Sequence, residues 1–225
     1  MRSRLVWLTS LPALALSAGA ALAQAPSDSG VAVAPDSVAR QLLVDVRSLD
    51  STIQVELRYA GTTNFTGAPL PGYEANRALL RREAAEALAR VQRRLRTGGM
   101  GLKIFDGYRP VRATAAMVTW ARRTGNLQLL REGYISSHSR HNRGLAVDVT
   151  LVDWSVGGRE VFMGTAYDTF SDSAHYANAS GRVLRYRQLL RRVMESEGFR
   201  QYEEEWWHYS LALPGDAPAF DLVVK

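Results

Sequence analysis

Residues Ser139 to Asp148 read SRHNRGLAVD, and our expectation for the whole chain is built outward from them. They combine one histidine, His141, with a glycine, Gly144, and then a run that favours extended backbone. A glycine permits a sharp turn after the histidine. The extended run can then return the Asp148 carboxylate to the imidazole, so that a metal ion receives one nitrogen and one oxygen ligand.

A second short motif, EWWH, runs from Glu205 to His208. Side chains three positions apart on a regular strand face opposite ways, so Glu205 can share a site with His208 only from a turn that precedes the strand. Two histidines and one aspartate leave the fourth position of a zinc ion open, which is typical of a catalytic site. A neighbouring glutamate can then take a proton from water.

Apolar spacing around these motifs predicts a mixed set of helices and short strands. Gly and Pro enrichment predicts a loop at 60–72. The expected helices are 76–96, 111–123 and 182–197, and the expected strands are 42–49, 52–59, 102–105, 145–152 and 206–213. The irregular order of these elements favours an α+β domain.

The N-terminus has the pattern of a secretory signal. Arg2 and Arg4 precede an apolar run that ends in Ala21-Leu22-Ala23, which predicts a signal peptide at 1–23 and an exported, periplasmic protein. An uncleaved membrane anchor is the alternative, but Pro12, Ser17 and Gly19 interrupt the run, so we expect no stable span in the mature chain. A flexible leader at 24–40 and one catalytic domain at 41–225 are expected to follow.

Composition excludes several kinds of chemistry. The chain contains no cysteine, which rules out disulfides, iron-sulfur clusters, thiolate zinc sites and a cysteine nucleophile. Lysine occurs only at 103 and 225, and neither a Ser-x-x-Lys pair nor a phosphate loop is present. The net charge of +6 includes two signal arginines, so the mature chain carries +6 − 2 = +4. Its arginines alternate with glutamates along expected helices, and we predict no nucleic-acid partner.

The motifs Ser-x-His-x-x-Gly-x-Ala-x-Asp and Glu-x-x-His together resemble those of the D-alanyl-D-alanine dipeptidase (VanX-type) family of zinc D,D-peptidases. The resemblance covers roughly residues 44–225. It extends to the segments Leu57-Arg58-Tyr59-Ala60, Asn64-Phe65-Thr66-Gly67, Gly72-Tyr73-Glu74-Ala75-Asn76-Arg77, Asp106-Gly107-Tyr108-Arg109-Pro110 and Met163-Gly164 with Tyr167-Asp168.

This resemblance implies a fold and an activity. The fold would be Hedgehog-like or D,D-peptidase-like: a small antiparallel sheet flanked by helices, with the metal at the edge of the sheet. One zinc ion per chain would be held by His141, Asp148 and His208, with Glu205 as general base. The reaction would be hydrolysis of the small dipeptide D-Ala-D-Ala during cell-wall peptide turnover.

The resemblance also implies roles for four further residues. Arg109 matches an arginine that faces the oxyanion, although an arginine before a proline can equally be a structural ion-pair partner. Asp168 and Tyr59 match positions that hold the substrate ammonium, and Ser139 matches a serine of the substrate pocket.

Other residues of these motifs are either excluded as ligands or depart from the family pattern. His138 and His175 are expected not to bind the metal. Arg140, Asn142 and Tyr167 depart from the residues that the family pattern leads us to expect, which bears on the shape of the pocket.

Three alternative functions remain compatible with these residues. The same metal motif can serve a D,D-carboxypeptidase or endopeptidase that acts on peptidoglycan stem peptides. Two histidines and a carboxylate also describe the iron site of an oxygenase, although the seven-residue spacing from His141 to Asp148 and the adjacent Glu205 argue against it. A zinc-containing wall-binding module would not need Glu205.

Overall fold

The computed structural model describes residues 32–215 and 217–225. The expected signal peptide and residues 24–31 of the expected leader lie outside this range. Within the range, no helix is long and apolar enough to cross a membrane.

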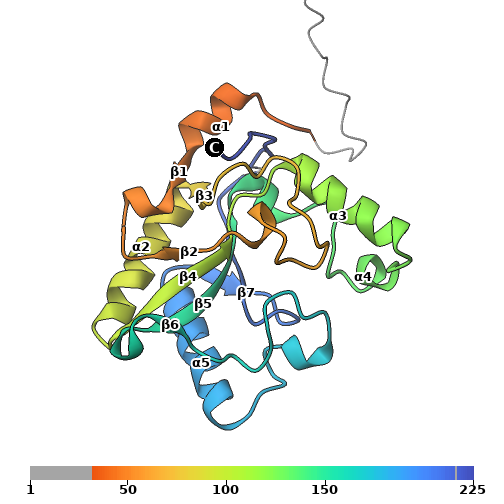
Figure 1. Ribbon diagram of the computed structural model, residues 1–225. Coiled ribbons are helices and arrows are strands. Elements are labelled where there is room, and N and C mark those ends of the chain that lie inside the picture. Colours follow the sequence, from red (N-terminus) through yellow and green to blue (C-terminus); the bar gives the residue numbers. More distant parts are fainter. Residues whose placement is uncertain (1–31, 216) are drawn as a thin grey trace, which may run out of the picture.

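The core of the molecule is a six-stranded sheet in the order β2-β4-β5-β8-β7, with β6 paired to β5 (Figure 1). Strand β2 runs parallel to β4, and the other pairs are antiparallel. This arrangement confirms an α+β fold with a small, mostly antiparallel sheet. The strands are β2 (Gln54–Val55), β4 (Met100–Asp106), β5 (Ala146–Asp153), β6 (Arg159–Glu160), β7 (Phe199–Gln201) and β8 (His208–Leu211).

Strand β5 separates the hydrophobic core from the face on which Asp148 lies. Val147, Val149 and Leu151 belong to the main hydrophobic core, together with residues of the helices at 82–96, 111–123, 128–131 and 181–195. Because side chains alternate along a strand, Asp148 faces the other side of the sheet. All residues of β5 except the last are buried, so both faces of the strand are covered.

Helices α2 (Arg82–Arg96) and α5 (Gly181–Glu195) pack against each other and against the sheet. Helix α3 (Val111–Arg123) lies on the opposite side of the molecule from α2, next to the short helix α4 (Gln128–Arg131) (Figure 1). The predictions for α3 and for the C-terminal end of α2 are confirmed.

The N-terminal part of the helix predicted at 76–96 is a strand instead. Residues Leu79–Arg81 form β3, which pairs antiparallel with β1 (Leu43–Asp45). A short apolar run fits either element, and here pairing with a distant strand decides the outcome.

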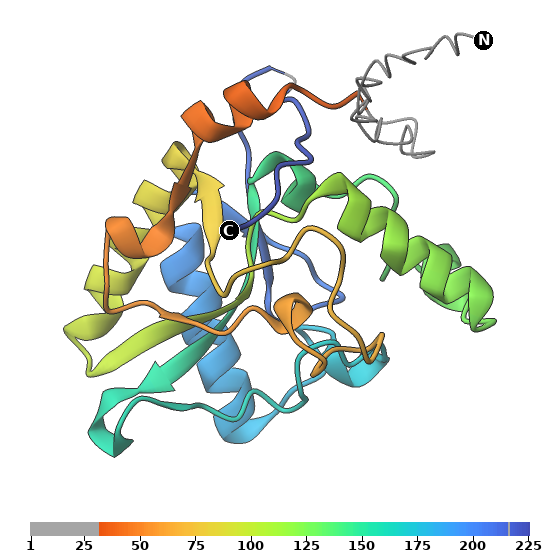
Figure 2. The same cartoon turned by 45° about the horizontal axis from the view of Figure 1, so that its top comes forward.

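The folded region begins before residue 41, the boundary that composition suggested. Helix α1 spans Asp36–Leu42, and the amide of Ala34 donates to the carbonyl of Ala219. Ala39 is buried in a small second cluster with Phe220 and Val224 of the C-terminal tail. Figure 2 shows α1 in orange close to this tail in blue. These apolar contacts order the end of a segment that looked like a flexible leader.

Candidate metal centre and active site

Backbone geometry brings together the three residues expected to bind metal. Asp148 on β5 and His208 on β8 are direct partners in the antiparallel ladder. His141 lies in a 3-10 helix that ends at Gly144, whose φ is +66°. A Cβ at Gly144 would lie 2.6 Å from a methyl of Leu43, so only glycine fits this turn. The turn predicted after His141 is confirmed.

The position of this site in the sheet differs from our expectation. Strands β5 and β8 are inner strands, so the site does not lie on an edge strand. It sits where the pairing of the two strands begins, with Asp148 opposite His208.

The ligand atoms are spaced as a tetrahedral metal requires. His141 Nε2 lies 3.3 Å from Asp148 Oδ1, and His208 Nδ1 lies 3.0 Å from the same oxygen. The two nitrogens are 3.2 Å apart. Ligand atoms at about 2.0–2.1 Å from a tetrahedral zinc lie about 3.3 Å from each other. The donor set of two imidazoles and one carboxylate therefore fits zinc in chemistry and in geometry.

Hydrogen bonds outside the triad orient two of the ligands. His141 Nδ1 lies 2.7 Å from the carbonyl of Gly107, to which it donates, and this leaves the lone pair on Nε2. The Tyr167 hydroxyl donates to Asp148 Oδ2 at 2.9 Å. The free oxygen, Oδ1, is the one that faces both histidines.

Electrostatics also favour a metal at this point. Burial lowers the pKa of His208, which favours the neutral imidazole that a metal requires. Burial acts to raise the pKa of the Asp148 carboxyl, but the imidazoles of His141 and His208 outweigh it and hold that pKa well below its usual range. The aspartate is therefore ionised and ready to coordinate.

Glu205 lies beside the triad. It sits in the turn before β8, as predicted, and its Oε2 is 3.9 Å from His208 Nδ1. Burial, together with the nearby charges of Asp148 and Asp168, raises the pKa of Glu205 well above its usual value. This carboxyl is close enough to act on a molecule at the centre and is not one of the three clustered ligands.

Arg109 is both an ion-pair partner and a wall of the site. Its Nε and Nη2 contact Asp106 Oδ2 at 2.9 and 2.8 Å, and its Nη2 lies 3.8 Å from Asp148 Oδ2. Asp106 is fully buried and also accepts from the Tyr73 hydroxyl at 2.6 Å. The carboxylate thus fixes the guanidinium in place, so the structural role considered for Arg109 and a role at the site coexist.

Asp168, Tyr59 and Ser139 complete the expected set. The Tyr59 hydroxyl donates to both oxygens of Asp168, at 3.0 and 3.2 Å. Asp168 has a φ of +60°, the one positive value among described residues other than glycine. Burial raises the pKa of Asp168 to about 8. The Ser139 hydroxyl accepts from the amide of His141 and so caps the 3-10 helix.

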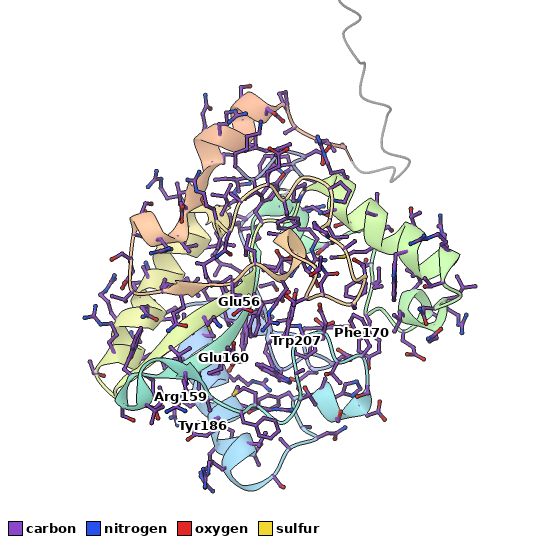
Figure 3. All side chains as sticks on the ribbon, in the orientation of Figure 1. Glu56, Arg159, Glu160, Phe170, Tyr186 and Trp207 are labelled. Carbon is purple, nitrogen blue, oxygen red and sulfur yellow. The ribbon has the colours of Figure 1, made fainter. Side chains whose placement is uncertain are left out.

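All eight expected residues line one cavity of about 330 Å³. Three larger hollows, of about 630, 660 and 350 Å³, contain none of the three clustered ligands among their described lining residues. Trp207 and Phe170 also line the smaller cavity, and Figure 3 shows Trp207 near the centre of the molecule with Phe170 to its right. The cavity is lined by Tyr59, Arg109, Ser139, His141, Asp148, Asp168, Glu205 and His208, among others.

The remaining histidines stand outside the metal cluster that the described residues form. His175 Nε2 lies 2.9 Å from the Tyr134 hydroxyl, and His138 Nδ1 lies 3.0 Å from Ser137 Oγ. Sequence reasoning missed Asp106 and Tyr73 as supports of Arg109. Both belong to motifs that carried the resemblance, so the signal was present without a role attached to it.

Comparisons with known proteins identify similar dipeptidases. The D-alanyl-D-alanine dipeptidase of Enterococcus faecium is 36% identical over 189 residues, which are 77% of this chain and 93% of that protein. The dipeptidase of the same name from Escherichia coli is 32% identical over 178 residues, covering 78% of this chain and 88% of that protein.

A solved structure of the vancomycin-resistance D,D-pentapeptidase VanY with Zn(II) covers 61% of this chain and 75% of its own, at 16% identity and a TM-score of 0.38. The family model described as D-ala-D-ala dipeptidase matches residues 39–221. This chain therefore belongs to the D-ala-D-ala dipeptidase family of peptidases.

Proposed function

We propose that this chain is an exported zinc dipeptidase that hydrolyses free D-Ala-D-Ala in cell-wall peptide turnover. The observation that carries the proposal is the convergence of His141, Asp148 and His208 in a cavity that also holds Glu205 and Arg109. The names of the dipeptidases from Enterococcus faecium and Escherichia coli support the substrate.

His141, Asp148 and His208 would hold the zinc ion. Zinc, when bound, supplies Lewis-acid chemistry that polarises a carbonyl and makes water more acidic. The tautomer of His141 and the charge of Asp148 are set by neighbouring groups of the chain, so the donors are prepared before the metal arrives.

Glu205 is the group that would move the proton. Its carboxylate accepts a proton from the attacking water and then donates it to the amine that leaves. The closeness of Glu205 Oε2 to His208, at 3.9 Å, supports this role. Burial keeps bulk water from competing for the proton.

Arg109 would stabilise negative charge on the scissile carbonyl oxygen. Asp106 fixes the guanidinium from behind, so little reorganisation is needed when that charge develops. The remaining surface of the guanidinium faces the cavity, where it lies near Asp148.

Asp168 and Tyr59 would hold the ammonium of the dipeptide. A buried carboxyl with a pKa of about 8 is stabilised in its charged form when a cation binds next to it. A cavity of about 330 Å³ is at the small end for ligand sites, which suits a dipeptide.

The proposal that the chain is exported rests on its first 23 residues. Two arginines, an apolar run and a small-residue end are the features of a secretory signal. An enzyme placed outside the cytoplasm would act on wall fragments, and for that reason we assign this chain to the recovery of wall peptides.

The proposal is tested on the chain from residue 24 onward, purified without chelators. We expect about one zinc ion per molecule, because three protein ligands make a catalytic site. We also expect turnover of D-Ala-D-Ala with little turnover of L-Ala-L-Ala. Iron in place of zinc, or faster cleavage of a stem pentapeptide than of the dipeptide, would contradict the proposal and favour the oxygenase or carboxypeptidase alternative.

A further inference from the structure

Asp168, one of the two residues that would hold the substrate ammonium, lies on an irregular segment, residues 163–175, which we call the Asp168 segment. Apart from one short 3-10 turn, Asp172–Ala174, it contains no helix or strand. Among the described residues, residues 164–173 make backbone hydrogen bonds only within the segment, and the carbonyl of Ala174 accepts one from the amide of Trp206. The position of residues 164–173 therefore depends largely on side chains that reach them from elsewhere.

Arg187, on helix α5, makes three such contacts with one guanidinium. Its Nε donates to the carbonyl of Met163 at 2.8 Å, its Nη1 to that of His175 at 2.6 Å, and its Nη2 to that of Ser173 at 3.1 Å. Met163 and His175 are the two ends of the Asp168 segment. One side chain thus closes the segment into a loop.

Arg187 is an unusual residue for a purely structural contact, because its side chain is only 1% exposed. Burial lowers the pKa of its guanidinium, and among the described residues only the Tyr209 hydroxyl counteracts that effect. Carbonyl dipoles of the segment, rather than a carboxylate, therefore stabilise its charge. A buried charge without a counter-ion is costly, which argues that this contact has a function.

The segment is also shaped to receive the guanidinium. Gly164 has a φ of +101°, and a Cβ at this position would lie 2.9 Å from Arg187 Nη2. Only glycine leaves room for this approach without a shift of the neighbours. Four residues beyond Gly164, Asp168 occupies its strained left-handed conformation.

We propose that Arg187 is a positioning residue that ties both ends of the Asp168 segment and so fixes Asp168 and Tyr167 at the substrate cavity. This inference rests on the proposed function for the identity of the ligand, a peptide with a free ammonium. Arg187 does not line the cavity. It acts through Asp168, which lines the cavity, and through Tyr167, which donates a hydrogen bond to Asp148.

A positioning role and a merely structural role predict different kinetics. Loss of a residue that only stabilises the fold lowers the fraction of active enzyme at unchanged KM. Displacement of Asp168 weakens substrate binding in the ground state and the transition state alike, so KM rises while kcat changes little.

The first test is Arg187→Lys, which keeps the positive charge but cannot donate to three carbonyls in a fork. We expect KM for D-Ala-D-Ala to rise about 10-fold to 100-fold, with kcat within about threefold of wild type. The matched control is Arg185→Lys, an exposed arginine on the same helix, which should leave both constants unchanged. A normal KM with reduced kcat in Arg187→Lys would overturn the inference.

A double-mutant cycle tests whether Arg187 acts through Asp168. If it does, adding Arg187→Lys to Asp168→Asn raises KM by less than about twofold beyond Asp168→Asn alone, because the two changes remove the same contact. If the increases in KM from the two single substitutions multiply in the double variant, Arg187 does not act through Asp168 and the inference is overturned.

Amide hydrogen exchange gives a readout that does not need activity. In Arg187→Lys, the amides of Ser171, Ala174 and His175, which donate backbone hydrogen bonds within the segment, should exchange at least about 10-fold faster, while those of β5 keep their protection. If the wild-type enzyme fails to hydrolyse D-Ala-D-Ala, the proposed function fails, but the exchange rates still test whether Arg187 holds the Asp168 segment in place. Unchanged exchange would overturn the inference even in an active enzyme.

Should Arg187→Lys fail to fold, Gly164→Ala tests the same contact from the other side. The added methyl group would lie 2.9 Å from both Arg187 Nη2 and Val183 Cγ1, so it displaces the guanidinium and leaves its charge in place. The same rise in KM and the same faster exchange are expected. Normal KM and normal exchange in Gly164→Ala would contradict the proposal.

Discussion

The proposed metal ligands and the residues proposed to bind the ammonium line the same cavity but are held in different ways. Asp148 and His208 face each other in a strand ladder, and a glycine turn with a serine cap holds His141. Asp168 lies on a segment without regular structure, tied by the side chains of Tyr59 and Arg187. The comparison teaches that strand pairing and a local turn fix the three proposed metal ligands, whereas side-chain contacts fix the residue proposed to bind the ammonium.

The largest effect is expected from Glu205→Gln, which tests the chemical half of this comparison. Glutamine has nearly the same shape but cannot take a proton, so kcat should fall by at least about 10²-fold. Zinc content should not change, because Glu205 is outside the ligand cluster. The matched control is Glu203→Gln, an exposed neighbour, which should retain full activity. Substantial turnover by Glu205→Gln would end its assignment as the base.

The second largest effect is expected from Arg109→Ala. Because the guanidinium is proposed to stabilise charge that develops in the transition state, kcat should fall by about 10²-fold to 10³-fold, with a smaller change in KM. Because Asp106 is fully buried, this variant also leaves a carboxylate without its counter-ion. Arg109→Lys restores the charge and serves as the control for folding. A lysine variant that folds normally and recovers full kcat would show that the guanidinium shape is unimportant.

The difference between the two regions also explains what could be predicted from the sequence. The proposed metal ligands lie in two short motifs. Gly144 signals the turn after His141, and the alternation of side chains along a strand requires that Glu205 lie in a turn before β8. Helix α3 was likewise predictable, because Pro110 marks its start.

Contacts between distant segments could not be predicted in this way. The hydrogen bond from Tyr167 to Asp148, the tie from Arg187 to Met163 and the pairing of β3 with β1 depend on tertiary packing. The spacing of residues within a short stretch of sequence does not predict which distant segments pack together. The inner position of the metal site, expected at the edge of the sheet, depends on strand order in the same way.

A smaller effect, on the stability of the folded protein, tests the burial of Asp168, the residue proposed to bind the ammonium. Burial raises the pKa of Asp168 to about 8, against about 3.9 in an unfolded chain. The folded state therefore binds the extra proton between these values, and stability falls as pH rises through this window. Asp168→Asn carries no charge and tolerates a positive φ, so it should be more stable than wild type at pH 8.

Thermal unfolding of the metal-stripped protein measures this effect. We expect Asp168→Asn to melt about 5 °C higher than wild type at pH 8 and to lose most of that advantage at pH 5. The control is Asp172→Asn, whose side chain on the same segment is exposed. An equal advantage at both pH values would mean that backbone strain, and not the buried charge, is relieved.

The most direct test of the account compares free D-Ala-D-Ala with its N-acetyl derivative on the wild-type enzyme. Acetylation removes the ammonium that Asp168 and Tyr59 are proposed to bind, and it adds bulk in a cavity of about 330 Å³. A site built to bind a charged amine rejects an analogue that lacks it, so kcat/KM should fall by about 10²-fold or more. Equal cleavage of the two compounds would contradict the account and make the enzyme a carboxypeptidase of longer peptides.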